Sequence, residues 1–99
     1  MLEELNENDK YYPLQEELRR LREDNGNNLF TLTLREINNL LTNGVLPNSA
    51  YDNGWFWRNE LTSPSHRQKR AWLSLNLRVV ERNNLNLIEQ TGRITFGPY

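Results

Sequence analysis

The sequence predicts an α+β fold with a small antiparallel sheet in a single domain. Leucines recur at helical spacing in the first quarter of the chain, a short alternating segment runs directly into a second helix start, and two extended segments lie near the C-terminus. A chain of 99 residues is the size of one domain and can bury one modest core without a metal or a disulfide. The sequence shows no internal repeat or low-complexity linker, so one compact unit is expected.

The first ten residues, MLEELNENDK, are charged and polar and show no apolar period. They predict a flexible acidic leader, with residues 11–99 forming the domain. A helix is expected from Pro13, because proline suits the first helical position. Its buried stripe is formed by Leu14, Leu18 and Leu21.

A short strand and a second helix are expected next. Residues 29–33 alternate apolar and threonine side chains, which is typical of a half-buried strand. Thr33 and Glu36 then match a capping box, in which the Thr33 hydroxyl accepts the Glu36 amide and the Glu36 carboxylate reaches back. The second helix therefore follows directly, with a buried stripe of Leu34, Ile37, Leu40 and Leu41.

An aromatic segment separates the second helix from a third. One helical turn is expected within residues 45–51, where Pro47 sets its start. Trp55, Phe56 and Trp57 follow. Three successive rings cannot all point the same way, so at least one is expected near the surface.

Ser63 and Pro64 form a strong helix start, and this third helix is expected to run to about Leu75. Helical spacing places Trp72 in the core and a basic row on the outside. The inner face is formed by Gln68, Ala71, Trp72 and Leu75, and the outer face by Arg67, Arg70 and Ser74.

The last two strands are expected to form an antiparallel hairpin. The first runs from Leu77 to about Leu87 with an irregularity at Asn83-Asn84, Thr91-Gly92 makes the turn, and residues 93–96 form the second. The order helix, strand, helix, helix, hairpin is that of the winged helix, in which residues 63–75 would face nucleic acid and residues 88–93 would be the wing. The roughly 20 residues between the second and third helices exceed a simple helix-turn-helix, so the match is partial.

The charge distribution favours a local anion contact. The formal net charge is −1, but residues 1–24 hold eight acidic and four basic side chains, whereas residues 55–82 hold six basic and two acidic ones. A segregated positive segment permits phosphate contact although the whole chain is nearly neutral. There is no cysteine, no apolar run long enough for a membrane span and only one histidine. We therefore expect a cytoplasmic protein without a metal or another cofactor.

The candidate nucleic-acid-binding residues lie in the basic segment. Cationic and amide side chains there can hold phosphate or read bases, and tryptophans can stack on an exposed base. The structural alternatives are that Asn59 caps its turn, that Trp57 packs in the core and that His66 is a hydrogen-bonding residue. The candidates are Arg58, Asn59, His66, Arg67, Gln68, Lys69 and Arg70, with Trp55 and Trp57 as the aromatic surface.

Several short blocks occur in a fixed order: Tyr12-Pro-Leu14, Leu46-Pro-Asn-Ser-Ala50, Phe56-Trp-Arg-Asn59, His66-x-Gln68, Ala71-Trp-Leu73 and Arg93-Ile-Thr-Phe96. Over residues 11–96 the chain resembles a small uncharacterised bacterial and phage domain family with Tyr-x-Pro-Leu, Leu-Pro-x-Ser-Ala, Trp-Trp-x-Asn, His-x-Gln-Ala-x-Ala-Trp-Leu and Val-x-Phe blocks. Phe56 replaces the first tryptophan of the pair, Lys69 stands where a small residue is usual, and the basic residue that closes the family pattern is missing. The resemblance implies one domain and assigns no activity.

Two functions from different classes follow. The first is a bacterial or phage DNA-binding module that contacts phosphate and bases through the basic third helix, as a monomer or a homodimer. The alternative is a phage-encoded protein that inhibits a host defence system through protein–protein contacts, because arginine with tryptophan and tyrosine is also the composition of protein hot spots. The sequence carries no catalytic signature, so an enzyme is not expected.

Overall fold

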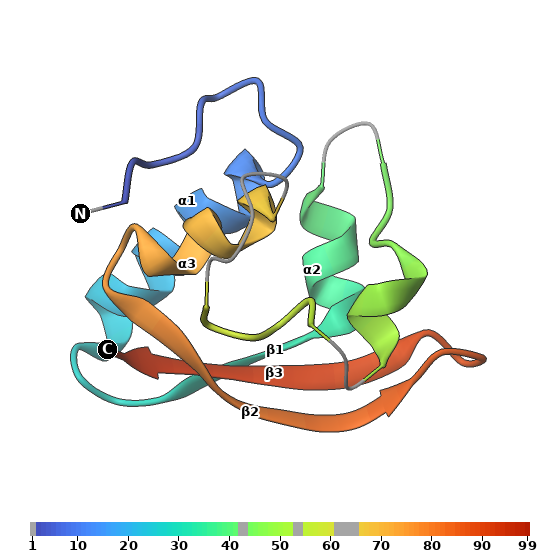
Figure 1. The fold of residues 1–99 in the computed structure, drawn as a ribbon. Helices are drawn as coiled ribbons and strands as arrows, with labels where there is room; N and C mark the ends of the chain where they lie inside the picture. The colour runs from blue at the N-terminus through green and yellow to red at the C-terminus, as the bar shows by residue number, and fades with distance from the viewer. Residues whose placement is uncertain (1, 42–43, 53–54, 61–65) are drawn as a thin grey trace.

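The computed structural model describes residues 2–41, 44–52, 55–60 and 66–99. Within these residues the chain forms three α-helices, two short 3₁₀ turns and a three-stranded antiparallel sheet, so the predicted α+β class is confirmed (Figure 1). The elements are α1 (Tyr12–Asn25), β1 (Phe30–Thr33), α2 (Leu34–Leu40), η1 (Asn48–Tyr51), η2 (Arg67–Lys69), α3 (Arg70–Leu73), β2 (Leu77–Asn86) and β3 (Thr91–Pro98).

The element order differs from the simple helix, strand, helix, helix, hairpin prediction. Two 3₁₀ turns, η1 and η2, lie between α2 and α3. The third helix is also shorter than expected, because α3 ends at Leu73 and the left-handed backbone of Asn76, with φ of 59°, turns the chain into β2. The predicted helix start at Ser63 and Pro64 lies outside the described residues.

The capping box predicted at the start of α2 is present. The Thr33 Oγ1 accepts the Glu36 amide at 3.0 Å, and Glu36 Oε1 accepts the Thr33 amide at 3.0 Å. This capping box satisfies two amide groups that a helix start would otherwise leave unpaired. The chain can therefore pass from β1 into α2 without a connecting loop.

The strands lie in the order β1-β3-β2, with β3 in the centre. Leu32 pairs with Ile94 and Leu77 with Pro98. The expected irregularity near Asn84 is present, since the β2–β3 register shifts between Asn83 and Asn86. The hairpin turn was predicted at Thr91-Gly92, but it lies at residues 87–90, and Thr91 already belongs to β3.

The core lies between the sheet and the three helices, which cover one face of the sheet and leave the opposite face open (Figure 1). Trp72 is fully buried, as predicted, and its ring centroid lies 5.5 Å from Trp57 and 6.0 Å from Phe96. The leucine stripe of α1 and Ile37 of α2 complete this cluster. The two buried tryptophans therefore lie where the aromatic loop (residues 55–60), α3 and the sheet meet.

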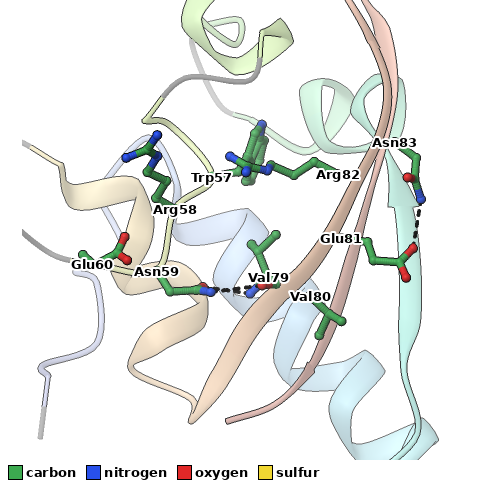
Figure 2. Close-up of a pocket in the computed structure, with 9 residues that line it drawn as sticks. All are labelled: Trp57, Arg58, Asn59, Glu60, Val79, Val80, Glu81, Arg82 and Asn83. Atoms are coloured by element: carbon green, nitrogen blue, oxygen red, sulfur yellow. Dashed lines mark hydrogen bonds between the residues drawn. The ribbon is translucent and has the colours of Figure 1, made fainter.

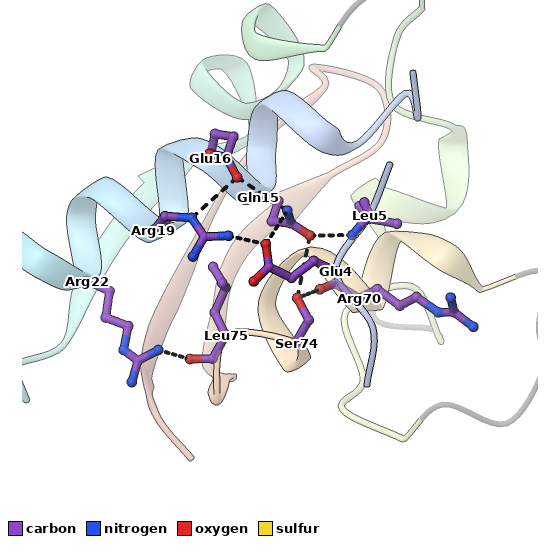
Figure 3. A network of polar contacts seen from close by, with 9 residues as sticks. All are labelled: Glu4, Leu5, Gln15, Glu16, Arg19, Arg22, Arg70, Ser74 and Leu75. Carbon is purple, nitrogen blue, oxygen red and sulfur yellow. Dashed lines mark hydrogen bonds and ion pairs between the residues drawn. The ribbon is translucent and has the colours of Figure 1, made fainter. Parts of the chain in front are cut away.

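Residues 2–10, predicted as a flexible leader, lie against α1 and α3 in the structure (Figures 1 and 3). Leu5 is only 8% exposed, and its amide donates to the buried Gln15 Oε1 at 2.7 Å. Glu4 pairs with Arg19 of α1. We name residues 2–10 the acidic strap. A single buried leucine leaves no periodic signal, so the sequence could not show this packing.

Replacing Leu5 tests whether the acidic strap contributes to stability. We expect Leu5→Ala to lower the free energy of unfolding by about 2 kcal/mol, because it removes a buried side chain at the edge of the core. Urea unfolding measures the change. The matched control is Leu87→Ala on the exposed hairpin turn, which should change stability by less than about 0.5 kcal/mol. Equal small losses for both variants would show that the strap packs only weakly.

Candidate nucleic-acid interface

Two of the predicted binding residues are buried and hold the loop of residues 55–60. Gln68 Nε2 donates to the carbonyl of Phe56 at 3.2 Å, and Lys69 Nζ donates to the carbonyl of Glu60 at 2.6 Å. Lys69 is 2% exposed. Lys69 was a candidate nucleic-acid contact, but its side chain is turned inward to a loop carbonyl.

Asn59 is the central polar residue of this region (Figure 2). Its Oδ1 accepts the Val79 amide at 2.9 Å and the Trp72 indole N–H at 3.1 Å, while its Nδ2 donates to the Val79 carbonyl at 3.0 Å. Trp57 is buried, and its indole donates to the Ala50 carbonyl at 2.8 Å. The structural alternative is confirmed for Trp57, which packs in the core. Asn59 does not cap its turn as that alternative expected, but joins its loop to α3 and β2.

Trp55 and His66 form the outer aromatic contact of the segment. Their rings stack with centroids 4.4 Å apart and an interplanar angle of 19°. Trp55 remains 43% exposed, whereas the Nδ1 of His66 is buried without a hydrogen-bond partner in the structure. One face of Trp55 is therefore already occupied by an imidazole, and His66 acts here as a packing residue.

The remaining predicted cations differ in their availability. Arg67 Nη2 forms an ion pair with Asp9 Oδ2 at 2.8 Å, and the Asp9 side chain is only 7% exposed. Arg70 is half-buried, and its Nε has no hydrogen-bond partner among the residues that the structure describes. Arg58 is exposed on the loop. Trp57, Asn59, Gln68 and Lys69 thus each make internal hydrogen bonds, and Arg67 of the predicted outer row is paired with Asp9.

A groove of about 560 Å³ runs between the aromatic loop and β2, which is an edge strand (Figure 2). Arg58 and Arg82 line it, but so do Glu60 and Glu81. The two signs of charge balance, so this groove has no net preference for an anion. At the inner wall of the groove, the Asn59 side chain is hydrogen-bonded to both backbone groups of Val79.

A second pocket lies at the base of the β2–β3 hairpin and was not predicted. Its volume is about 430 Å³, and no carboxylate is among its lining residues: Thr33, Arg35, Asn84, Thr91, Gly92 and Arg93. The two arginines are 58 positions apart in the sequence. They meet because Thr33, which precedes α2, pairs with Arg93 in the sheet. No sequence spacing signals this contact; only the alternation of Arg93 with buried Ile94 places Arg93 on the open face.

The arginines of this chain differ in whether a carboxylate pairs with them. Arg19, Arg20 and Arg67 form ion pairs with carboxylates. In contrast, Arg78 and Arg93 alternate with buried residues of β2 and β3 and point away from the helices. Within the described part of the chain, these two and Arg35 are exposed and have neither an ion pair nor a hydrogen bond to a side chain or carbonyl.

The described residues contain no group of three or more His, Asp or Glu side chains that could hold a metal ion. None of the helices described is long and apolar enough to cross a membrane. Comparison with protein-family models, curated proteins and solved structures finds no match for this chain.

The Asn59 network predicts a large loss of stability for a small substitution. Asn59→Ala leaves the Trp72 indole N–H and the Val79 backbone groups without their partner, so we expect the free energy of unfolding to fall by about 2 kcal/mol. Thermal or urea unfolding measures it. Asn39→Ala, at an exposed position of α2, is the matched control and should change stability by less than about 0.5 kcal/mol. Similar values for both would contradict the network's role.

The buried ammonium group of Lys69 should make the free energy of unfolding depend on pH. Burial lowers the pKa of Lys69 from its ordinary value of 10.5, with Glu60 opposing and Arg58 adding to the shift. Between the lowered pKa and 10.5, the unfolded chain binds more protons than the folded chain, so raising the pH favours folding. The free energy of unfolding of the native chain should therefore rise relative to that of Lys69→Met as the pH increases from about 7 to about 10.

Denaturant unfolding of both proteins at several pH values gives this difference directly. Burial raises the pKa of Tyr11 and of Tyr51, which acts in the opposite sense at high pH. Both tyrosines are present in both proteins, so their contribution cancels in the comparison. A difference that stays constant with pH would show that Lys69 keeps an ordinary pKa in the folded state.

Proposed function

We propose that this chain is a small nucleic-acid-binding module of the cytoplasm, with DNA as the expected ligand. The observation that carries the proposal is the contrast among its arginines. Arg19, Arg20 and Arg67 on the helical side form ion pairs with carboxylates, whereas Arg78 and Arg93 on the open face, and Arg35 at the start of α2, have no such partner among the described residues. Unpaired arginines on an open surface are suited to bidentate phosphate contacts. The proposed interface is thus the open face and the hairpin, and not the third helix.

Neutral polar side chains between these arginines support the same interface. Thr31 and Thr95 share a hydroxyl contact of 2.8 Å across β1 and β3, and Thr33 pairs with Arg93. Hydroxyl and amide groups contribute many of the contacts that proteins make to phosphate and sugar. Glu81 is an acidic residue of β2, the strand that pairs with β3, and Asn83 Nδ2 donates to its carboxylate at 3.1 Å. Phosphate contact and orientation, more than base reading, are therefore the proposed role.

A winged-helix relationship fits this proposal in part. The strand order β1-β3-β2 and the hairpin that follows α3 are features that a wing would need. Under this proposal the hairpin is the wing that approaches nucleic acid. The four-residue α3 and the ion pair of Arg67 with Asp9 speak against a separate recognition helix.

A protein partner is the second candidate, and one observation favours it. Ile88 at the hairpin turn is 91% exposed, and Leu87 beside it is also exposed. Exposed apolar side chains at a projecting turn suit a contact with another protein, which fits the expectation of an inhibitor. Trp55 lies on the aromatic loop, away from this turn in the sequence, so the hairpin turn is the part of the surface that this candidate would use.

Fluorescence anisotropy with labelled duplex and single-stranded DNA tests the primary proposal. Three phosphate contacts predict that affinity for the duplex falls about 40-fold between about 50 mM and about 200 mM salt. Arg78→Ala/Arg93→Ala should weaken binding and lower the salt slope by about 2. The control Arg19→Ala/Arg20→Ala makes the same change of charge on α1 and should leave the slope nearly unchanged.

Binding that responds equally to both double variants would reject the proposed interface and leave only an effect of net charge. Absence of binding at the lower salt concentration, for duplex and single strand alike, would reject the nucleic-acid proposal. In that case, loss of a co-purifying protein on Ile88→Ser would support the second candidate.

A further inference from the structure

We propose that the pocket at the base of the β2–β3 hairpin binds one sugar–phosphate unit. The inference rests on the proposed function, under which this unit belongs to a nucleic-acid strand. It is more specific, because it assigns one binding subsite to Arg35 and Arg93 and separates them from Arg78, which lies outside the pocket. The pocket forms where β1 ends and α2 begins, beside the part of the hairpin that continues past the β1–β3 pairing.

The size and the wall of this pocket fit such a unit. Its volume of about 430 Å³ lies in the range of small-molecule pockets and exceeds what a bare phosphate fills. The wall is mostly carbon surface, which suits the apolar side of a ribose or deoxyribose ring. A free inorganic anion would leave this carbon surface in contact with water.

The polar groups of the pocket fit a phosphate. Two arginines, Arg35 and Arg93, belong to its lining, and no residue with a carboxylate does. The nearby Glu36 is turned onto the backbone and hydroxyl of Thr33, where it completes the capping box. Guanidinium groups offer paired donors that match two phosphate oxygens, and a charge-assisted contact of this kind is stronger than a neutral hydrogen bond.

Asn84 and Thr91 also line the pocket, and neither side chain has a hydrogen bond within the described part of the chain. Asn84 adopts a left-handed backbone with φ of 58°, at the position where the β2–β3 register shifts. A carboxamide and a hydroxyl can each serve a sugar hydroxyl or a phosphate oxygen. The pocket therefore contains donors and acceptors that the fold itself leaves unused.

Gly92 belongs to the lining of the pocket and packs closely against neighbouring leucines. Its φ is +148°, and a Cβ atom there would lie 2.7 Å from Leu85 Cδ2 and 3.0 Å from Leu34 Cδ1. The side chains of Leu85 and Leu34 therefore lie against the backbone of β3 at this position, where only glycine fits. This packing supports the backbone of the pocket at Gly92.

Titration of ¹⁵N-labelled full-length chain with a single-stranded oligothymidylate tests the inference. The largest amide shifts should occur at residues 91–93 and 33–35. Arg35→Ala and Arg93→Ala should each weaken binding about tenfold or more, since each removes a charged hydrogen-bond donor. Thr91→Val keeps the shape of the side chain and should weaken binding severalfold. Arg78→Ala is the control on the same open face and should cost about threefold, as one screened phosphate contact.

The outcomes separate this inference from the proposed function. Equal weakening by the three arginine variants, with shifts spread over the open face, would overturn the pocket and leave nucleic-acid binding in place. No binding of the oligonucleotide, of a duplex or of thymidine 5′-monophosphate at low salt would overturn both. Spectra of the free variants must match the native spectrum outside the substituted residues, so that a loss of folding is not mistaken for a loss of binding.

A second arm identifies the source of the unit. Thymidine 5′-monophosphate should produce the same pattern of shifts at the pocket at higher concentration, and the oligonucleotide should compete with it. Competition by the oligonucleotide supports a strand as the ligand. If the mononucleotide binds this pocket and the oligonucleotide does not compete, the sugar–phosphate site stands and the proposed function fails. Thymidine without phosphate should produce no shifts there, and equal binding of the nucleoside would overturn the role of the arginines.

Discussion

The carboxamide of Asn59 is the interaction on which the arrangement of this fold most depends. It binds both backbone groups of Val79 in β2 and the indole of Trp72 in α3, so three segments distant in the sequence meet at one side chain. Trp72 in turn lies between Trp57 and the central-strand residue Phe96. Loop, helix and sheet are thus positioned by a polar contact at the margin of an aromatic core. Because each partner is a buried or half-buried polar group, loss of the carboxamide leaves unpaired donors and acceptors.

Local sequence signals predicted the elements whose cause is local. The leucine spacing of α1 and the capping box before α2 each depend on residues within one or two turns of each other, and both are present. The third helix shows where such signals fail. The sequence predicts one regular helix over residues 63–75. In the structure, residues 67–69 form a 3₁₀ turn, in which the spacing of side chains around the axis differs. Lys69 accordingly faces inward, and its partner is a loop carbonyl that no local pattern reveals.

The candidate site was harder to predict than the fold, for a related reason. A row of cations in the sequence does not show which of them are already paired. Arg67 is a predicted binding residue, but it forms an ion pair with Asp9. Arg35 and Arg93 are not among the predicted residues, and yet they line the same pocket. Their meeting depends on strand register across more than half of the chain. Asn59 and Gln68 also show that polar residues in a basic segment can serve the fold, because both are hydrogen-bonded to backbone groups of other segments.

The packing of the acidic strap has a practical consequence for experiments on this chain. Residues 1–9 contain four carboxylates and no cationic side chain, so a truncated chain that begins at Lys10 would carry a formal charge of +3 in place of −1. The same truncation would release Arg67 and Arg19 from Asp9 and Glu4. Such a fragment would attract any polyanion, specific or not. Affinity measured on a trimmed or proteolysed sample could therefore be an artefact of the missing segment, and binding studies should use a protein whose N-terminus has been verified by mass spectrometry.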